Sequence, residues 1–460
     1  MGAAAVSFLF VSCNGTSVPD PDPKDENSVL VGVTAQEDVS VDAIVNEVFS
    51  ADEDIALPED LEKQKQNKES LLLAAQDLND RYGGGNGSYH KNVTYTVVTL
   101  NYKSVDGNGN PVTLSGKLTL PKVAGEYVMI EDFLLHCHAT NIDVTGKGVS
   151  NATFKDMAAY SFAILDPDYM GFGVTSGKPQ TYLCQKLIGR QCVDMELAAL
   201  EYMKQEGVQI KDGYGTYVMG YSQGGGNAMA VGRYLQVTDE GRQANAKVNL
   251  KGMFCGAGPY SPEGTFNHWL QSDSLSLSPV LSMVIKGQQE GHSDIMKNIN
   301  LTSYFSEDYL VSGVPQAFDT GNLSNMLGLL NADKELESIQ YPEPENPTTY
   351  DVLLLKLMPW MQFSKIMSPE FSNPNSHIRQ ALLECLKLEC VNDWTPRVPV
   401  ELYTAPRDNV IPVQANAIDT YEKFHGAGAN VTLVKAGELA NHITGQVAWV
   451  NHVKIMLKRL

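Results

Sequence analysis

The feature that most constrains the fold of this chain is the segment 220–224, which has the sequence GYSQG and is followed by two further glycines. An apolar run over residues 216–219 precedes it and predicts a buried strand, and residues 227–235 behind it predict a helix. A serine between a strand and a helix is held on a sharp, strained turn that exposes its hydroxyl group. Small residues flank it because neighbouring backbone passes very close to such a turn. The segment therefore predicts a strand, a turn and a helix that present Ser222 as a nucleophile.

Around this segment, apolar strand-like runs alternate with helical stretches. Strands that are apolar on both faces and separated by helices are typical of a mostly parallel sheet covered by helices on two sides. A hairpin precedes them, because residues 93–102 alternate, residues 106–110 favour a turn and residues 112–120 return. The sequence thus predicts an α/β fold with a mostly parallel central sheet and an N-terminal hairpin. The strands expected after the hairpin are residues 129–136, 159–165, 216–219, 247–255, 399–404 and 431–435.

The pattern changes between residues 260 and 394, where helical stretches rich in Leu and Met contain no clear strand. We interpret this segment as a helical cap, inserted before the strand that leads to Asp408. Its apolar side chains could line an acyl pocket, although any single one is more often part of the core of such a cap. The expected organisation is a signal segment (1–13), a tether and N-terminal helical segment (14–88), a first core part (89–260), the cap (261–395) and a second core part (396–460).

The N-terminus has the features of an export signal. Residues 3–11 are apolar, a run too short to span a bilayer but long enough for the apolar part of a signal peptide. Residues 9–13, LFVSC, are similar to a bacterial lipoprotein cleavage box, after which Cys13 would carry lipid. Phe10 in place of Leu and the lack of Lys or Arg before the run depart from that pattern. We expect a lipoprotein at the cell envelope, or otherwise a periplasmic or secreted protein with an ordinary signal peptide.

The chain is acidic, with a formal net charge of −20 over 460 residues. This balance argues against nucleic acid as a partner, because phosphates are bound by Lys and Arg. No CxxC pair or His-rich cluster indicates a metal site, and His136 and His138, two residues apart, lack a third ligand nearby in sequence. No glycine-rich segment has the spacing of a nucleotide-binding loop. We therefore expect no cofactor and no metal.

Seven cysteines are present, one at the expected lipidation site and six in the body of the chain. An exported compartment permits disulfides. Cys184 with Cys192, and Cys385 with Cys390, are close enough in sequence to pair, but sequence alone does not decide the connectivity. Two others lie in apolar, strand-like surroundings and are expected to be buried small residues: Cys137 and Cys255.

The serine needs an acid as well as a base. A serine hydroxyl is a poor nucleophile at neutral pH unless a histidine takes its proton and an acid orients that histidine. After a serine turn of this kind, the acid comes first along the chain and the histidine second. Asp408 is the candidate acid, because it follows the strand at residues 399–404 and lies in a turn before Pro412. Asp393 and Asp419 are the alternatives, and a solvated turn or a helix cap is the other explanation for Asp408.

His442 is the candidate base. It follows the last expected strand and precedes the final helix, in a loop that can reach the serine. His425 precedes that strand, which should place it at the opposite edge of the sheet. His452 lies within the final helical stretch, where a structural role is the simpler interpretation.

The tetrahedral intermediate of acyl transfer needs backbone N–H donors for its oxyanion. One should be the amide of Gln223, which follows the nucleophile, and another should come from the loop after an early strand. That loop begins at residues 138–141, so the amide of Ala139 or Thr140 is the second candidate.

Taken together, these motifs resemble the α/β-hydrolase superfamily and, more narrowly, its secretory-lipase and related bacterial esterase branch. The resemblance extends over residues 89–460, and Ala139, where glycine is usual, and the cap depart from it. It implies a cofactor-free hydrolase that cleaves esters of small molecules, lipids or acylated glycans through an acyl-enzyme, with Ser222, His442 and Asp408 as its triad. The resemblance depends on residues 116–121 (GKLTLP), 168–173 (DYMGFG), 220–225 (GYSQGG), Asp408 before Pro412, and His442 with Gly445.

Two other functions remain open at this point. A serine peptidase on the same fold would need carboxylates to bind a peptide amine, for which Glu343 and Glu345 in the cap are the only candidates. A non-catalytic binding protein would have lost the chemistry, which the intact Ser222, Asp408 and His442 argue against.

Overall fold

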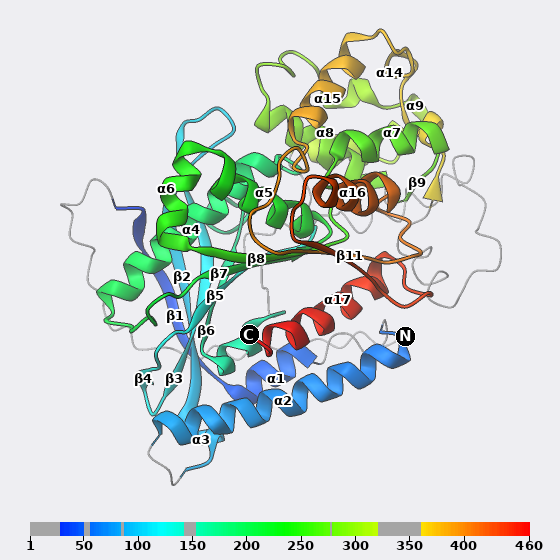
Figure 1. The fold of residues 1–460 in the computed structure, drawn as a ribbon. Coiled ribbons are helices and arrows are strands. Elements are labelled where there is room, and N and C mark those ends of the chain that lie inside the picture. Colours follow the sequence, from blue (N-terminus) through cyan, green and yellow to red (C-terminus); the bar gives the residue numbers. More distant parts are fainter. Residues whose placement is uncertain (1–27, 50–55, 84–86, 142–152, 277, 321–359) are drawn as a thin grey trace, which may run out of the picture.

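The computed structural model describes residues 28–49, 56–83, 87–141, 153–276, 278–320 and 360–460, and its centre is one ten-stranded sheet (Figure 1). Along the sheet the strands follow the order β1-β2-β3-β6-β5-β7-β8-β11-β12, and β4 pairs with β3. The strands are β1 (Leu30–Ser40), β2 (Val93–Val105), β3 (Pro111–Val123), β4 (Glu126–Tyr127), β5 (Asp132–Cys137), β6 (Phe162–Pro167), β7 (Thr216–Tyr221), β8 (Leu250–Gly256), β11 (Val400–Thr404) and β12 (Val431–Lys435).

The sheet has an antiparallel end and a parallel end. The pairs from β1 to β6 across β2 and β3 are antiparallel, whereas β6, β5, β7, β8, β11 and β12 are parallel to one another. In the parallel part, His136 on β5 pairs with Met219 on β7, and Gly220 pairs with Cys255 on β8. The carboxyl ends of these strands therefore lie at one edge. This arrangement confirms the predicted mostly parallel sheet and its N-terminal hairpin.

Helices cover both faces of the sheet, and each layer has its own apolar core. Each core combines buried residues of its helices with residues of β2, β3, β5 and β7. Figure 1 shows the two groups of helices on opposite faces of the sheet. The first layer contains α4 (Gln185–Gln205), α5 (Gln223–Val237), α6 (Asp239–Val248) and α16 (Asp419–Gly426). The second contains α1 (Val41–Phe49), α2 (Pro58–Tyr82) and α17 (His442–Leu457), and the short α3 (Tyr89–Asn92) precedes β2.

A separate group of helices lies between β8 and β11 in the sequence and forms a third apolar core over one end of the sheet (Figure 1). Leu275, Leu281 and Met283 are buried in this core, which agrees with the expectation that most apolar residues of the cap belong to its own core. The elements are α7 (Pro262–Ser272), β9 (Leu275–Ser276), α8 (Ser278–Gly291), α9 (Glu307–Leu310), α10 (Val314–Thr320), β10 (Trp360–Met361), α13 (Phe363–Ile366), α14 (Pro369–Ser372) and α15 (His377–Leu388). The helical cap of the predicted fold is thus present.

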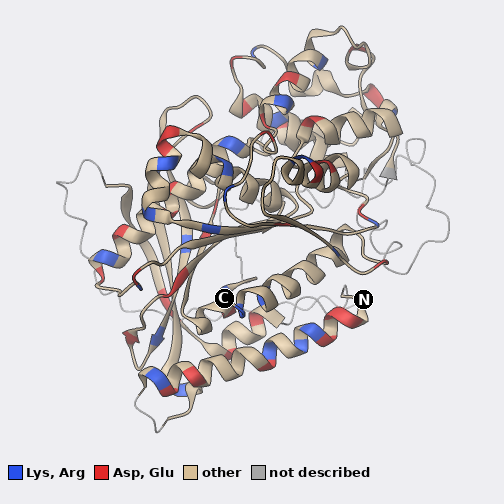
Figure 2. Ribbon diagram, in the orientation of Figure 1, with Lys and Arg blue, Asp and Glu red and all other residues tan. Residues whose placement is uncertain are grey.

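Charged residues of both signs lie along the length of α2 (Figure 2). Among the helices of the described residues, none is both long enough and apolar enough to cross a bilayer.

Three features of the fold differ from the expectations. β1 lies within the segment expected to be tether and helix. It is an edge strand whose residues are mostly exposed, so its sequence showed no alternation of buried and exposed positions. β9 and β10 form a two-stranded ribbon in a segment where no strand was expected. Neither suggested disulfide forms, since all six cysteines of the described residues are free thiols. Cys13, Glu343 and Glu345 lie outside the described residues.

Candidate active site

Ser222 lies on a strained turn between β7 and α5. Its φ of 57° and ψ of −125° are unusual for a residue with a side chain, and its N–H donates to the carbonyl of Gly256 at 2.9 Å. The neighbouring glycines are required by close backbone contacts. A Cβ on Gly224 would lie 2.0 Å from the carbonyl oxygen of Cys137, and one on Gly225 would lie 2.3 Å from that of Gly256. The glycine-rich sequence therefore makes this turn possible.

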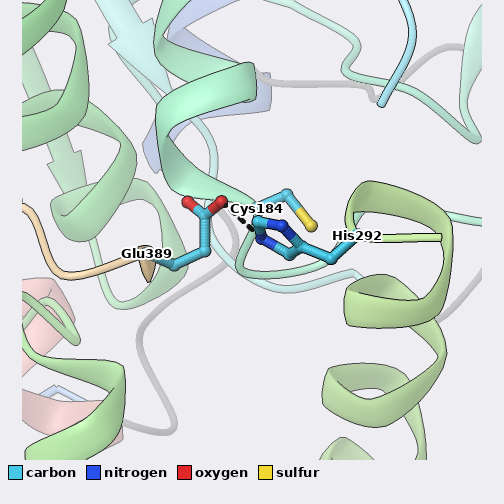
Figure 3. A group of neighbouring side chains, drawn as sticks. All are labelled: Cys184, His292 and Glu389. Atoms are coloured by element: carbon cyan, nitrogen blue, oxygen red, sulfur yellow. Dashed lines mark hydrogen bonds and ion pairs between the residues drawn. The ribbon is translucent and has the colours of Figure 1, made fainter. Parts of the chain in front are cut away.

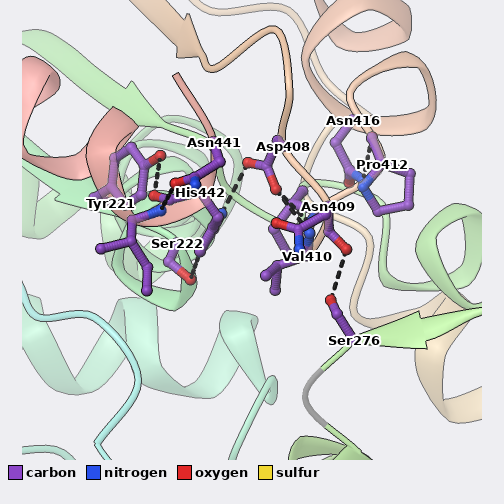
Figure 4. Close-up of polar contacts among 12 residues, drawn as sticks. Tyr221, Ser222, Ser276, Asp408, Asn409, Val410, Pro412, Asn416, Asn441 and His442 are labelled. Carbon is purple, nitrogen blue, oxygen red and sulfur yellow. Dashed lines mark hydrogen bonds and ion pairs between the residues drawn. The ribbon is translucent and has the colours of Figure 1, made fainter. Parts of the chain in front are cut away.

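His442 begins α17 and faces the serine. Its Nε2 lies 2.9 Å from Oγ of Ser222, which is hydrogen-bond distance (Figure 4). Asn441 caps the helix, since its side chain accepts the N–H groups of Ile443 and Thr444. The hydroxyl of Tyr221 donates to the carbonyl oxygen of His442 at 2.9 Å. These contacts fix the backbone from which the imidazole projects.

Asp408 follows β11 and contacts the other side of the His442 ring. Its Oδ2 lies 2.8 Å from Nδ1 of His442, and its side chain is only 1% exposed (Figure 4). The other oxygen, Oδ1, accepts the N–H groups of Val410 at 2.9 Å and Ile411 at 2.8 Å. The two amides hold the carboxylate in one orientation. We call Ser222, His442 and Asp408 the serine cluster, and its geometry allows a proton to pass from the serine to a histidine that a carboxylate orients.

The alternative residues lie elsewhere. Asp393 forms an ion pair with Arg233, with N···O distances of 2.6 and 2.9 Å, and Asp419 accepts from Gln414. Nε2 of His452 lies 2.7 Å from Oε1 of Glu401, and the ring of His425 stacks on Tyr421. None of these contacts involves the serine cluster.

The segment expected to hold the oxyanion follows β5 and lies beside the serine. Ala139, Thr140 and Gln223 all border the same pocket as Ser222. His138, just before them, is buried and stacks on Tyr169 with ring centroids 3.9 Å apart. Burial lowers the pKa of His138 to about 4, so this imidazole is neutral at physiological pH.

The pocket beside the serine has a volume of about 230 Å³ and lies between the core and the cap. Its apolar wall includes two cap residues, Trp269 and Val280, and two residues before α4, Tyr182 and Leu183. Sequence analysis missed all four, because they lack a motif and only tertiary packing brings them to the serine. The other lining residues are Ala139, Thr140, Gln223, Pro259, Thr265, Ser276, Val410, Ile411, His442, Ile443 and Gln446.

No protein-family model matches the sequence, and no curated protein matches it significantly. Solved structures do resemble it. The rice cell wall degrading esterase LipA from Xanthomonas oryzae is 18% identical with a TM-score of 0.62, over 93% of this chain and 98% of that one. A putative hydrolase from Legionella pneumophila is 19% identical with a TM-score of 0.59, over 85% and 94% of the two chains.

Candida antarctica lipase A is a more distant likeness, with 13% identity and a TM-score of 0.51 over 81% of this chain and 76% of that one. At these identities the likeness concerns the fold. Together with the order of the strands and the turn at Ser222, it identifies the α/β-hydrolase fold in this chain.

Proposed function

We propose that this protein is a serine hydrolase of carboxylic esters. The observation that carries the proposal is the unbroken line of contacts from Asp408 through His442 to Ser222, which ends at the wall of a largely apolar pocket. The esterase and lipase neighbours support the same class of reaction, since they share the fold. Export through a lipidated Cys13 is part of the proposal and depends on the N-terminal sequence alone.

In the proposed mechanism, His442 Nε2 takes the proton of Ser222 as Oγ attacks the ester carbonyl carbon. Asp408 keeps Nδ1 protonated and stabilises the imidazolium that forms. The C–O bond to the alcohol then breaks, and the alcohol leaves with the proton from Nε2. Water repeats the sequence on the acyl-enzyme and releases the acid.

The oxyanion would be stabilised by backbone N–H groups at the pocket wall. We assign this role to the amides of Gln223 and of Ala139 or Thr140, which border the pocket together with Ser222. Because these donors belong to backbone, their positions depend on packing rather than on side-chain identity. An alanine at 139 in place of glycine is compatible with this role, since only the amide is used.

The volume of the pocket favours an acyl group of short or medium chain length. A dry cavity of about 150 Å³ holds one benzene ring, so a pocket of about 230 Å³ suits a short or medium acyl chain better than a long one. Esters of small molecules, lipids and acylated glycans all remain in the proposed substrate class.

The test is hydrolysis of p-nitrophenyl esters from acetate to palmitate, with Ser222→Ala beside the unmutated protein. We expect turnover that peaks at short or medium chains and is abolished by Ser222→Ala. Ser70→Ala on α2, whose hydroxyl donates to the carbonyl of Gln66 in the same helix, is the matched control and should retain full activity. Equal activity of Ser222→Ala and the unmutated protein would contradict the mechanism. Absence of activity at every chain length would favour a peptidase or a binding protein instead.

A further inference from the structure

A second group of reactive side chains lies where the cap meets the core. Cys184 immediately precedes α4, His292 follows α8, and Glu389 follows α15. Each offers one ligand-type atom, a sulfur, a ring nitrogen or a carboxylate oxygen, and these atoms all lie within 4.8 Å of one another (Figure 3). Cys184 and Glu389 are buried, and the side chain of His292 is 16% exposed. We call these three residues the cysteine cluster.

The carboxylate of Glu389 is held from both sides. Its Oε1 lies 2.9 Å from Nε2 of His292 (Figure 3). Its Oε2 accepts the N–H of Lys186 at 2.9 Å. The carbonyl oxygen of Glu389 also accepts the side-chain amide of Gln185 at 3.0 Å. Outer contacts of this kind orient the carboxylates and imidazoles that ligate metals in proteins.

The thiol of Cys184 is equally well fixed. Its Sγ lies 3.1 Å from the carbonyl oxygen of Gly287, and it lies so close to Gly291 that a Cβ there would approach it to 2.2 Å. The side-chain nitrogen Nε2 of Gln288, a residue one turn before His292, lies 3.8 Å from the same sulfur. Among the described residues, no group donates to Oε1 of Gln288, although this oxygen is buried.

We propose that Cys184, His292 and Glu389 bind one Zn²⁺ ion. Thiolate, imidazole and carboxylate are the ligands that this ion prefers, and three such protein groups are a common zinc set. Three protein ligands leave the fourth position of a tetrahedral zinc site to a metal-bound water. Binding removes the thiol proton of Cys184 to solvent, breaks its hydrogen bond to Gly287, and replaces the contact between His292 and Glu389 with two bonds to the metal.

Such an ion would join the cap to the core beside the pocket. Tyr182 and Leu183, which line the pocket, directly precede Cys184. Leu183 has a φ of 58°, and a Cβ on Gly287 of α8 would lie 2.3 Å from the carbonyl oxygen of Tyr182. The hydroxyl of Tyr182 is 2.8 Å from Oγ1 of Thr140 in the expected oxyanion segment. A metal at Cys184 would therefore hold this wall of the pocket in place, and its presence does not depend on the proposed ester hydrolysis.

The experiment is a titration of chelator-treated full-length protein with Co²⁺, a spectroscopic substitute for Zn²⁺. We expect one Co²⁺ per chain, with a near-ultraviolet band from thiolate-to-metal charge transfer. Cys184→Ala should abolish the band, and His292→Ala should abolish stoichiometric binding. The matched controls Cys192→Ala, on the helix α4 that follows Cys184, and His377→Ala, at the start of α15, should leave both unchanged. A band that persists in Cys184→Ala would overturn the proposal.

Native mass spectrometry of the unmutated protein decides the question even if the variants fold poorly. Addition of Zn²⁺ to chelator-treated protein should give one bound ion per chain and raise its melting temperature. A chain that takes up no ion at equimolar Zn²⁺ would contradict the proposal.

Discussion

The serine cluster and the cysteine cluster each combine an acid, a histidine and a nucleophilic atom, but they differ in their position relative to the pocket. Ser222 and His442 border a pocket of about 230 Å³, whereas none of the three residues of the cysteine cluster is among its lining residues. Asp408 contacts a histidine that lines the pocket, while Glu389 contacts His292, which is not among the lining residues. The two proposals therefore assign chemistry to the cluster that borders a pocket and a structural role to the cluster that does not. The following substitutions test this distinction.

The largest effect is expected from His442→Ala, which removes the base. Loss of one triad member lowers kcat by about 10⁴-fold or more in enzymes of this kind. His452→Ala on the same helix, whose ring contacts Glu401, should change kcat less than about threefold. Steady-state hydrolysis of a short p-nitrophenyl ester measures both. Similar losses in the two variants would mean that helix α17 is merely destabilised.

Asp408→Asn should lower kcat by about 10³- to 10⁴-fold, because an amide facing Nδ1 favours the wrong tautomer of His442. The fold should persist, since the oxygen of Asn can still accept the N–H groups of Val410 and Ile411. Asp393→Asn and Asp419→Asn are the matched controls, and neither should affect kcat appreciably. If Asp393→Asn were the inactive variant, the assignment of the acid would be wrong.

These two predictions follow from residues that sequence analysis could identify. Ser222, Asp408 and His442 each follow a strand in the order that the fold requires, so local motifs and chain order are enough to propose them. The cysteine cluster is different, because its members come from helix ends far apart in the sequence and meet only through packing of the cap on the core. Tertiary packing also brings Trp269 and Val280 to the pocket. The sequence did not predict β1, because an edge strand buries too few residues to show an alternation of apolar and polar positions.

His138, beside the serine cluster, should make the fold sensitive to acid. Its pKa is lowered by burial from 6.5 to about 4, so between these pH values the unfolded chain binds a proton that the folded chain does not. The stabilisation is full above pH 6.5 and is lost as the pH falls toward 4, by about 3 kcal/mol at most. Urea denaturation at several pH values should show a shallower dependence for His138→Gln than for the unmutated protein. The exposed His268→Gln should leave it unchanged, and equal slopes for His138→Gln and the unmutated protein would contradict the prediction.

The smallest effect is expected from Glu389→Gln in the cysteine cluster. It weakens a buried charged contact with His292 and the bond from Lys186, at a cost of about 2 kcal/mol in the free energy of unfolding. Ester hydrolysis by the metal-free variant should stay within about threefold of the rate of the metal-free unmutated protein, since the residue does not line the pocket. Glu384→Gln, exposed on the helix α15 that precedes Glu389, is the control for denaturation. A loss of activity comparable to that of Asp408→Asn would contradict the claim that only the serine cluster takes part in ester hydrolysis.

The most direct test of the account is covalent labelling with a fluorophosphonate, which reacts with serines activated for acyl transfer. We predict one adduct per chain, located on Ser222 by peptide mass spectrometry and absent from His442→Ala and from urea-unfolded protein. Labelling should remain in Glu389→Gln, because the cysteine cluster does not activate the serine. No adduct on the folded protein, or an adduct on another residue, would contradict the claim that Ser222 is the nucleophile.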